Sequence, residues 1–186
     1  ASDTQPTSID WENQVSIELL KHRHRFVGKP MFLEDEGRCI GKVNMSEYLH
    51  QKMQKAPRAI LEVDIDLRIK LITDDYIESA WPQYQALYGD LAEIEFSRYI
   101  LDNLARIQKR LGGDKYKQVR QCFELALTQF YINQDASGFN EGIHTLLVCY
   151  YDPMYRYQLS TKAVEIIFQG PENDYLEWAK DRIANA

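Results

Sequence analysis

The chain has 186 residues, of which 45% are hydrophobic and 27% charged, and its formal net charge at pH 7 is −6. This composition is typical of a globular protein of one or two domains and excludes collagen-like, low-complexity and strongly basic chains. No apolar run approaches the roughly 20 residues that a bilayer span requires, and the first residues do not have the pattern of a signal peptide. The three widely spaced cysteines favour buried thiols in a reducing compartment, so we expect a cytoplasmic protein.

The first eighty residues alternate between helix and strand patterns. Amphipathic helices are predicted over residues 9–22 and 46–55, and each begins next to a side chain that can cap it. Residues 30–35 (PMFLED) and 58–64 (RAILEVD) have the short, apolar character of buried strands. Two such strands joined by a helix predict a parallel βαβ unit.

The middle of the chain has the spacing of long helices. A helix is predicted from residue 65 to about 80, where Trp81-Pro82 ends it. Apolar residues then recur with helical period over 93–111 and 114–133, and the glycine pair between these segments predicts an αα-hairpin.

The end of the chain returns to the pattern of the beginning. Residues 163–170 (AVEIIFQG) read as a strand, and Pro171 opens a final helix. We therefore predict a mostly helical α/β fold with a parallel sheet of about three strands. Residues 1–81 are predicted to form the first part of the α/β core and residues 82–159 an all-α insertion. Residues 160–186 are predicted to supply the last strand and helix of the core. A sheet this thin is expected to leave one edge unpaired, which would favour self-association.

The stretch FLEDEGRCIG is the first that suggests chemistry. A buried strand would deliver Asp35 and Glu36 to the end of the sheet where α/β proteins bind ligands, with Arg38 following. Such an acid can hold Mg²⁺ in folds that handle phosphate. The alternative is a solvated turn with an internal ion pair. The chain contains no GxxxxGK[ST] motif, so these residues do not supply a phosphate-binding loop.

Positive charge is concentrated in two regions, the stretch KHRHR over residues 21–25 and the predicted hairpin. Arg106, Lys109 and Arg110 form a basic segment in an otherwise acidic chain, a pattern that suits the backbone of a folded RNA. A solvated helix face balanced by nearby acids is an equally good interpretation.

The stretch YYDPMYRYQL, residues 150–159, combines four tyrosines with one acid and one arginine. Tyr151 and Tyr155 are four residues apart, so on a helix they would share a face, with Asp152 and Arg156 beside them. The rings could stack on bases while the arginine binds phosphate. In the alternative, Asp152 caps a helix and the phenols fill gaps in a structural corner.

Four stretches together resemble one family. YYDPMYRYQL, FLEDEGRCIG, the opening QPTSIDWEN and the run ILEVDIDLRIKLITDDY are similar, in this order, to the C-terminal portion of the bacterial tRNA 2-selenouridine synthases. The resemblance covers nearly the whole chain and implies that the small parallel sheet belongs to an incomplete P-loop NTPase core.

The resemblance implies a transferase that replaces sulfur by selenium at the wobble 2-thiouridine of tRNA. The family's reaction passes through an S-geranylated intermediate and uses selenophosphate and geranyl diphosphate, with Mg²⁺ as a further candidate. The catalytic cysteine loop and the P-loop of the family are not found in these residues, so no residue of this portion is assigned a catalytic role. The resemblance implies binding roles for two sets of residues: Asp35 (also as a metal ligand), Glu36, Arg38 and Arg68 toward phosphate, and Tyr151, Asp152, Tyr155, Arg156, Tyr157, Arg106, Lys109 and Arg110 toward tRNA or substrate.

Two other functions remain open from the residues alone. A portion of a nucleotide-kinase-like phosphotransferase would bind ATP and act without tRNA. A non-catalytic helical interaction module would present an apolar groove on the insertion and no anion site at the strand ends.

Overall fold

The computed structural model describes residues 5–35, 37–161 and 164–185. The chain divides into two compact units, one built from residues 1–62 and 163–186 and the other from residues 63–162. The second unit thus begins at Val63, whereas the predicted insertion begins at Pro82. Among the described residues, no helix combines the length and the hydrophobicity needed to cross a membrane.

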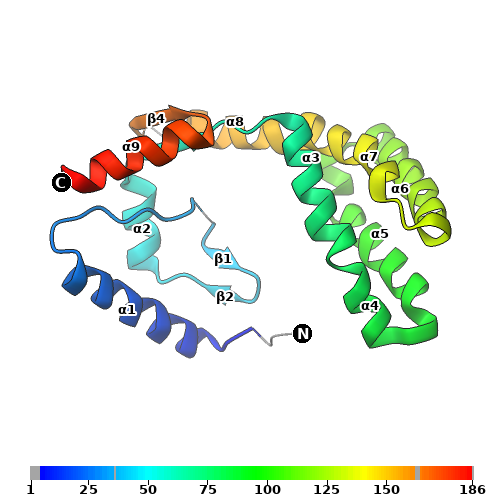
Figure 1. The fold of residues 1–186 in the computed structure, drawn as a ribbon, viewed down its shortest axis with the longest axis horizontal. Helices are drawn as coiled ribbons and strands as arrows, with labels where there is room; N and C mark the ends of the chain where they lie inside the picture. Colours follow the sequence, from blue (N-terminus) through cyan, green and yellow to red (C-terminus); the bar gives the residue numbers. More distant parts are fainter. Residues whose placement is uncertain (1–4, 36, 162–163, 186) are drawn as a thin grey trace. The chain divides into compact units, whose positions relative to one another are not determined.

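The first unit, here called the α/β unit, contains three helices and four short strands among its described residues (Figure 1). They are α1 (Ser8–Arg25), β1 (Cys39–Ile40), β2 (Val43–Asn44), α2 (Glu47–Lys55), β3 (Arg58–Leu61), β4 (Ile166–Gly170) and α9 (Glu172–Ala184). Strands β3 and β4 pair in parallel, with Arg58 opposite Ile166 and Leu61 opposite Gly170. Strands β1 and β2 form a separate antiparallel hairpin. The prediction of a small parallel sheet is confirmed, but among the described residues it has two strands, not three.

The predicted strand over residues 30–35 is wrong. These residues have no regular secondary structure as far as they are described, so the predicted parallel βαβ unit with 58–64 does not form, and β3 pairs with β4 instead. The apolar pattern has another cause: Phe32 packs edge-on against two rings of α9, with centroid distances of 6.1 Å to Tyr175 and 5.7 Å to Trp178.

The antiparallel hairpin was not predicted from the sequence. Its two-residue turn is Gly41-Lys42, and Gly41 has a φ of +61°, which favours glycine. Gln5 holds the turn: its side chain donates to the Ile40 carbonyl over 2.6 Å and accepts from the Lys42 amide over 2.7 Å. A side chain at position 41 would have its Cβ only 2.7 Å from the Gln5 Nε2 atom. The backbone angle therefore favours glycine here, and a larger residue would also displace the Gln5 amide that holds the turn.

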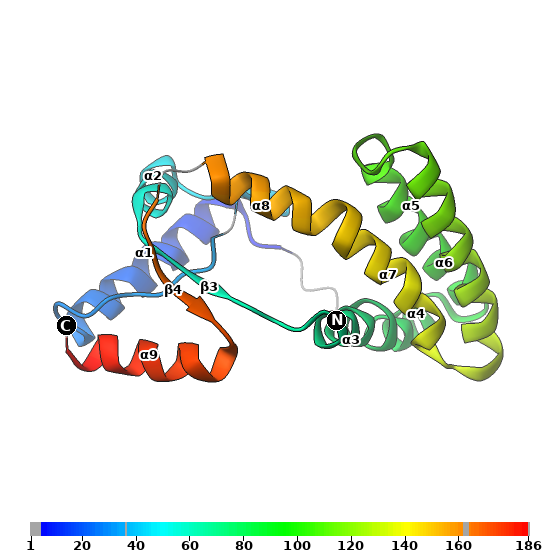
Figure 2. The same cartoon turned by 90° about the horizontal axis from the view of Figure 1, so that it is seen from above.

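The second unit, here called the helical unit, is helical throughout its described length apart from short connections. In order it contains α3 (Ile65–Thr73), the π-helical turn η1 (Asp74–Glu78), α4 (Trp81–Tyr88), η2 (Gly89–Leu91), α5 (Ala92–Leu111), α6 (Gly113–Asn133), η3 (Ala136–Phe139), α7 (Asn140–Leu146), the π-helical turn η4 (Leu147–Tyr151) and α8 (Asp152–Thr161). Helices α7 and α8 run on through η4 as one continuous helical segment (Figure 2).

The predicted αα-hairpin is confirmed, and the helical segment that begins at residue 65 ends at Glu78, near the predicted position, but the role predicted for Trp81-Pro82 is wrong. Helices α5 and α6 are joined at Gly112, whose φ of +90° ends α5 in a conformation that favours glycine. The pair Trp81-Pro82 begins helix α4 and does not end the preceding one. Proline is tolerated in a first turn because its missing N–H has no partner there in any case.

The core of the helical unit lies between these helices. Phe96 of α5, Val119 of α6 and Phe139 of η3 are fully buried. Trp81 is also buried and contacts Phe96 at a centroid distance of 5.4 Å. This core supports the tyrosine-rich segment, because Tyr150 and Tyr151 pack against it from the side.

Candidate functional site

The tyrosine-rich stretch lies at the junction between η4 and α8. Tyr150 and Tyr151 are the last two residues of the π-helical turn, and Asp152 is the first residue of α8. The helical backbone continues from η4 into α8 through Asp152 without a break. Asp152 is therefore not the N-cap of a separate helix, which the structural-corner alternative requires. π-Helical turns within helices are rare and occur frequently at functional sites.

Asp152 is bound by an arginine from another helix. Arg68 of α3 donates from Nη2 to Oδ1 of Asp152 over 2.6 Å and from Nη1 to Oδ2 over 3.2 Å. The two side chains are 28% and 20% exposed, so the pair is largely shielded from water. A bidentate contact of this kind is among the stronger ion pairs in proteins and fixes the orientation of both groups. Arg68 therefore neutralises Asp152 and ties α8 to α3.

The predicted pairing of Tyr151 with Tyr155 is present in the structure. Their rings lie nearly parallel, with an interplanar angle of 25° and a centroid distance of 6.4 Å. Tyr150 meets Tyr151 edge-on at 4.8 Å. Burial raises the pKa of Tyr151 above its ordinary value of 10.0, with smaller contributions from Tyr150, Tyr155 and Tyr76. Tyr155 is half exposed, so the pair presents an aromatic surface to solvent.

Arg156 is exposed and forms no ion pair or hydrogen bond with any residue in the described part of the chain. It stands four residues after Asp152, a spacing at which an acid and an arginine on one helix ordinarily attract each other. Asp152 is engaged by Arg68 instead. The charge of Arg156 is thus available to an external anion beside the two stacked rings.

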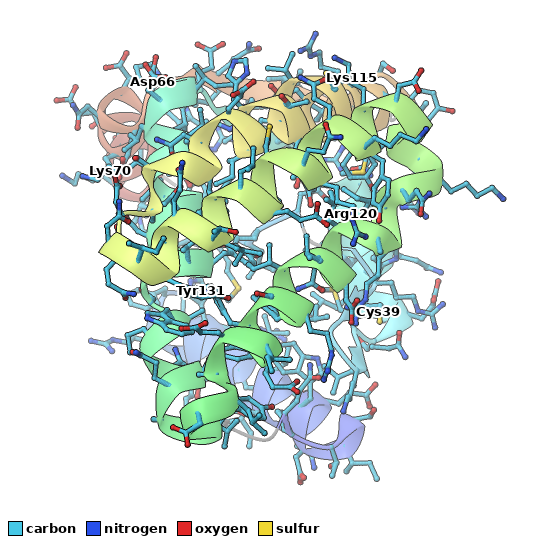
Figure 3. The ribbon with its side chains drawn as sticks, turned by 90° about the vertical axis from the view of Figure 1, so that its right-hand side faces the viewer. Cys39, Asp66, Lys70, Lys115, Arg120 and Tyr131 are labelled. Carbon is cyan, nitrogen blue, oxygen red and sulfur yellow. The ribbon has the colours of Figure 1, made fainter. Side chains whose placement is uncertain are left out.

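The basic residues of the hairpin are exposed. Arg106, Lys109 and Arg110 form no ion pair or hydrogen bond through their side chains with residues 5–35, 37–161 and 164–185. Arg120 of α6, by contrast, donates to Glu124 over 2.8 Å and to the Tyr116 hydroxyl over 3.1 Å. Figure 3 shows Arg120 and Lys115 on this helix. Within the described structure, the unpaired cations of the predicted tRNA-binding set are thus Arg106, Lys109 and Arg110 on α5 and Arg156 on α8. Tyr157, the remaining member of the set, is 69% exposed on α8.

The residues predicted to bind phosphate belong to both units. Arg68 is part of the helical unit, and Asp35 and Arg38 are part of the α/β unit, while Glu36 lies outside the described residues. Arg38 pairs with Glu47 over 2.9 Å, and both side chains are more than half exposed. This ion pair is exposed, but its acid lies on α2, outside residues 34–38, so it is not the internal ion pair of the alternative interpretation.

Asp35 is held by a buried arginine that sequence reasoning did not single out. Arg58 of β3 donates from Nε to Oδ2 of Asp35 over 2.8 Å and from Nη2 to Oδ1 over 3.3 Å. The guanidinium already neutralises this carboxylate and would repel a divalent cation next to it. The described residues contain no group of three His, Cys, Asp or Glu side chains placed to hold a metal ion. Asp35 does not fit a Mg²⁺ site in this arrangement.

The sequence predicted buried cysteines, and this prediction is wrong for two of the three. Cys39 and Cys149 are exposed, and Cys122 is partly buried. Burial raises the pKa of the Cys122 thiol, which disfavours the reactive thiolate.

Comparison with known proteins identifies relatives over nearly the entire chain. The family described as "tRNA 2-selenouridine synthase AAA domain" matches residues 1–186. Proteins named tRNA 2-selenouridine synthase are 41% identical in Marinobacter nauticus, 37% in Shewanella sp. and 37% in Aeromonas salmonicida. The matches cover 95 to 97% of this chain and 48% of each relative, so the chain spans about half the length of these relatives. No solved structure matches.

Proposed function

The chain belongs to the tRNA 2-selenouridine synthase family, and we propose that its helical unit binds tRNA for the reaction that replaces sulfur by selenium at the wobble 2-thiouridine. The complete transferase would work in the cytoplasm through an S-geranylated intermediate, with selenophosphate and geranyl diphosphate as co-substrates. The family match favours this function over the kinase-like and interaction-module alternatives.

One observation carries the proposal. Asp152 is neutralised by Arg68, so the exposed guanidinium of Arg156 stands unpaired beside the stacked rings of Tyr151 and Tyr155. An unpaired arginine next to aromatic faces is the combination that binds an unstacked nucleotide, because the cation contacts the phosphate while a ring stacks on the base. The same arginine could contact the diphosphate of a prenyl donor.

The basic residues of α5 would hold the RNA backbone at a distance from the base. Arg106, Lys109 and Arg110 are exposed along the second half of this helix. Contacts of this kind position a nucleic acid without reading its sequence, and their number sets the salt dependence of binding.

The α/β unit would contribute to an incomplete P-loop NTPase core, as the resemblance implies. Arg38 is proposed there as a phosphate partner, whereas Asp35 and Glu36 are anions that would repel a phosphate unless a cation lay between them. In the helical unit, Arg68 is proposed separately as a phosphate partner. Arg68 has a second proposed role, which is to bind Asp152 and so keep it from pairing with Arg156. The observed contact between Arg68 and Asp152 supports this role more directly than it supports phosphate binding.

The test is equilibrium binding of tRNA to the purified protein and to Arg156→Ala and Arg156→Lys variants. We expect the alanine variant to lose about 1 to 3 kcal/mol of binding free energy, the range for a charge-assisted contact, and the lysine variant to retain most of it. Thermal unfolding serves as the control and should be unchanged, because Arg156 is exposed. A variant that binds normally but unfolds at a much lower temperature would show that the stretch is structural.

A further inference from the structure

Helix α1 is covered by its own unit on one side. Trp11, Val15, Leu19 and His22 follow one another at spacings of four, four and three residues, so they share one face of the helix, and each is partly buried. Figure 1 shows α1 along one edge of the α/β unit, with α2 and the β1–β2 hairpin on a single side of it. None of the 18 residues of α1 is fully buried.

The opposite side of α1 is apolar and open to solvent. Ile9, Asn13, Ile17 and Leu20 share this side, again at spacings of four, four and three residues, and none of them carries a charge. The three apolar side chains are 72%, 50% and 65% exposed. We call these four residues the outward stripe. Apolar side chains on both sides of a helix are typical of a helix that is covered on both sides.

The outward stripe has a charged rim of mixed sign. With about 100° between successive residues, Glu12 and Arg23 lie on one side of the stripe. Asp10 and Lys21 lie on the other side, and Lys21 pairs with Glu18 over 2.7 Å. Acids and bases thus alternate around the stripe, which does not suit a polyanion such as RNA. An apolar strip inside a polar rim is the composition of an interface between protein surfaces.

The rest of the α/β unit also lacks apolar contacts. Of the 21 hydrophobic residues that are buried in the described structure, 18 form the core of the helical unit. The remaining three, Val43, Met45 and Ala179, are all that the described part of the α/β unit buries. Even the aromatic rings around Trp178 are only partly buried. A compact unit ordinarily has a hydrophobic core of its own, so further apolar surface is expected to complete this one.

The relatives indicate what supplies that surface. The matched region is 48% of each relative, so about half of their length lies outside it. We propose that the outward stripe of α1 is a docking surface, covered in the complete family protein by the part of its chain that these 186 residues do not include. The docked segment is apolar where it meets Ile9, Ile17 and Leu20. This inference does not depend on the proposed binding of tRNA.

The experiment compares the 186-residue chain with a chimera, in which this chain replaces the matching half of a full-length relative that is 41% identical to it. Hydrogen exchange followed by mass spectrometry reports how well the backbone amides of α1 are protected in each protein. Ile17→Asp and Leu20→Asp place a charge on the outward stripe. Leu125→Asp on α6 of the helical unit is the matched control, because Leu125 is 66% exposed, close to the 65% of Leu20.

We expect the amides of α1 to exchange at least about 10-fold more slowly in the chimera than in the chain alone, because covering the stripe suppresses local opening of the helix. Ile17→Asp and Leu20→Asp should each remove most of this difference, since a carboxylate is unfavourable in an apolar contact. In the chain alone, both substitutions should leave the helix content by circular dichroism unchanged, because these side chains face solvent. Leu125→Asp should change the exchange of α1 in neither protein.

Several results would overturn the proposal. One is equal exchange of α1 in the two proteins, and another is full protection of α1 in chimeras that carry Ile17→Asp or Leu20→Asp. An equal loss of protection with Leu125→Asp would show that the aspartates act through general stability and not through the stripe. Light scattering of the chain alone tests a different occupant: a dimer that Leu20→Asp converts to a monomer would show that the stripe joins two copies of this chain instead.

Discussion

The ion pair between Arg68 and Asp152 should contribute measurably to the stability of the helical unit, in contrast to most surface pairs. Both carboxylate oxygens are bound, and the side chains are only 28% and 20% exposed. A hydrogen bond to a charged group is worth about 1.5 to 3 kcal/mol when buried, and the residual exposure reduces this. We expect a coupling energy of about 1 to 2 kcal/mol from the cycle of Arg68→Ala, Asp152→Ala and the double variant.

A second pair in the same unit provides the matched control. Arg120 and Glu124 are one turn apart on α6, and their side chains are 44% and 45% exposed. Such a pair contributes about 0.3 to 0.5 kcal/mol. Urea unfolding followed by circular dichroism gives both coupling energies, and hydrogen exchange of the α8 amides localises the effect. A coupling for Arg68 and Asp152 no larger than the control value would refute the reasoning that burial strengthens this contact.

Two further predictions concern packing and pH. Gly142→Ala on α7 should destabilise the helical unit by about 1 to 3 kcal/mol in thermal unfolding, because the new Cβ would overlap the Phe123 ring; an increase in stability would show that the ring can move aside. Burial raises the pKa of Tyr84, Tyr99 and Tyr151 above 10.0, so their neutral form stabilises the folded state fully below pH 10, and this contribution is lost as the pH rises through the folded pKa values. The free energy of unfolding, measured between neutral and alkaline pH, should therefore decrease. A free energy of unfolding that is constant across that range would contradict the prediction.

The sequence predicted the features that depend on local pattern. The helical hairpin followed from the period of residues 93–111 and 114–133 and from the glycines between them, and β3 followed from its apolar run. The failures came from tertiary contacts. Residues 30–35 look like a strand because Phe32 is packed, but its partners are rings of α9 more than a hundred residues away in sequence. Spacing alone does not distinguish packing on a helix from packing in a sheet.

In the candidate site, too, local spacing was predictable from the sequence and tertiary contacts were not. Helical spacing was sufficient to place Tyr151, Asp152, Tyr155 and Arg156 together, because the four lie within two turns. Spacing could not predict that Arg68, from α3, takes up Asp152, since that contact depends on how two distant helices pack.

The contact between Arg68 and Asp152 leads to a prediction about tRNA binding, which tests whether Arg68 acts by keeping Asp152 from pairing with Arg156. In an Arg68→Met variant, Asp152 loses its partner and becomes free to attract Arg156 four residues further along the helix. The guanidinium would then be neutralised within the protein, so tRNA affinity should fall by an amount approaching that of Arg156→Ala, although Arg68 itself contacts no RNA in the proposed site. Adding Asp152→Asn should restore much of the affinity, because the amide carries no charge to compete for Arg156. If the double variant binds as weakly as Arg68→Met alone, Arg68 acts on the RNA directly or through the fold, and the argument that it works by occupying Asp152 is wrong.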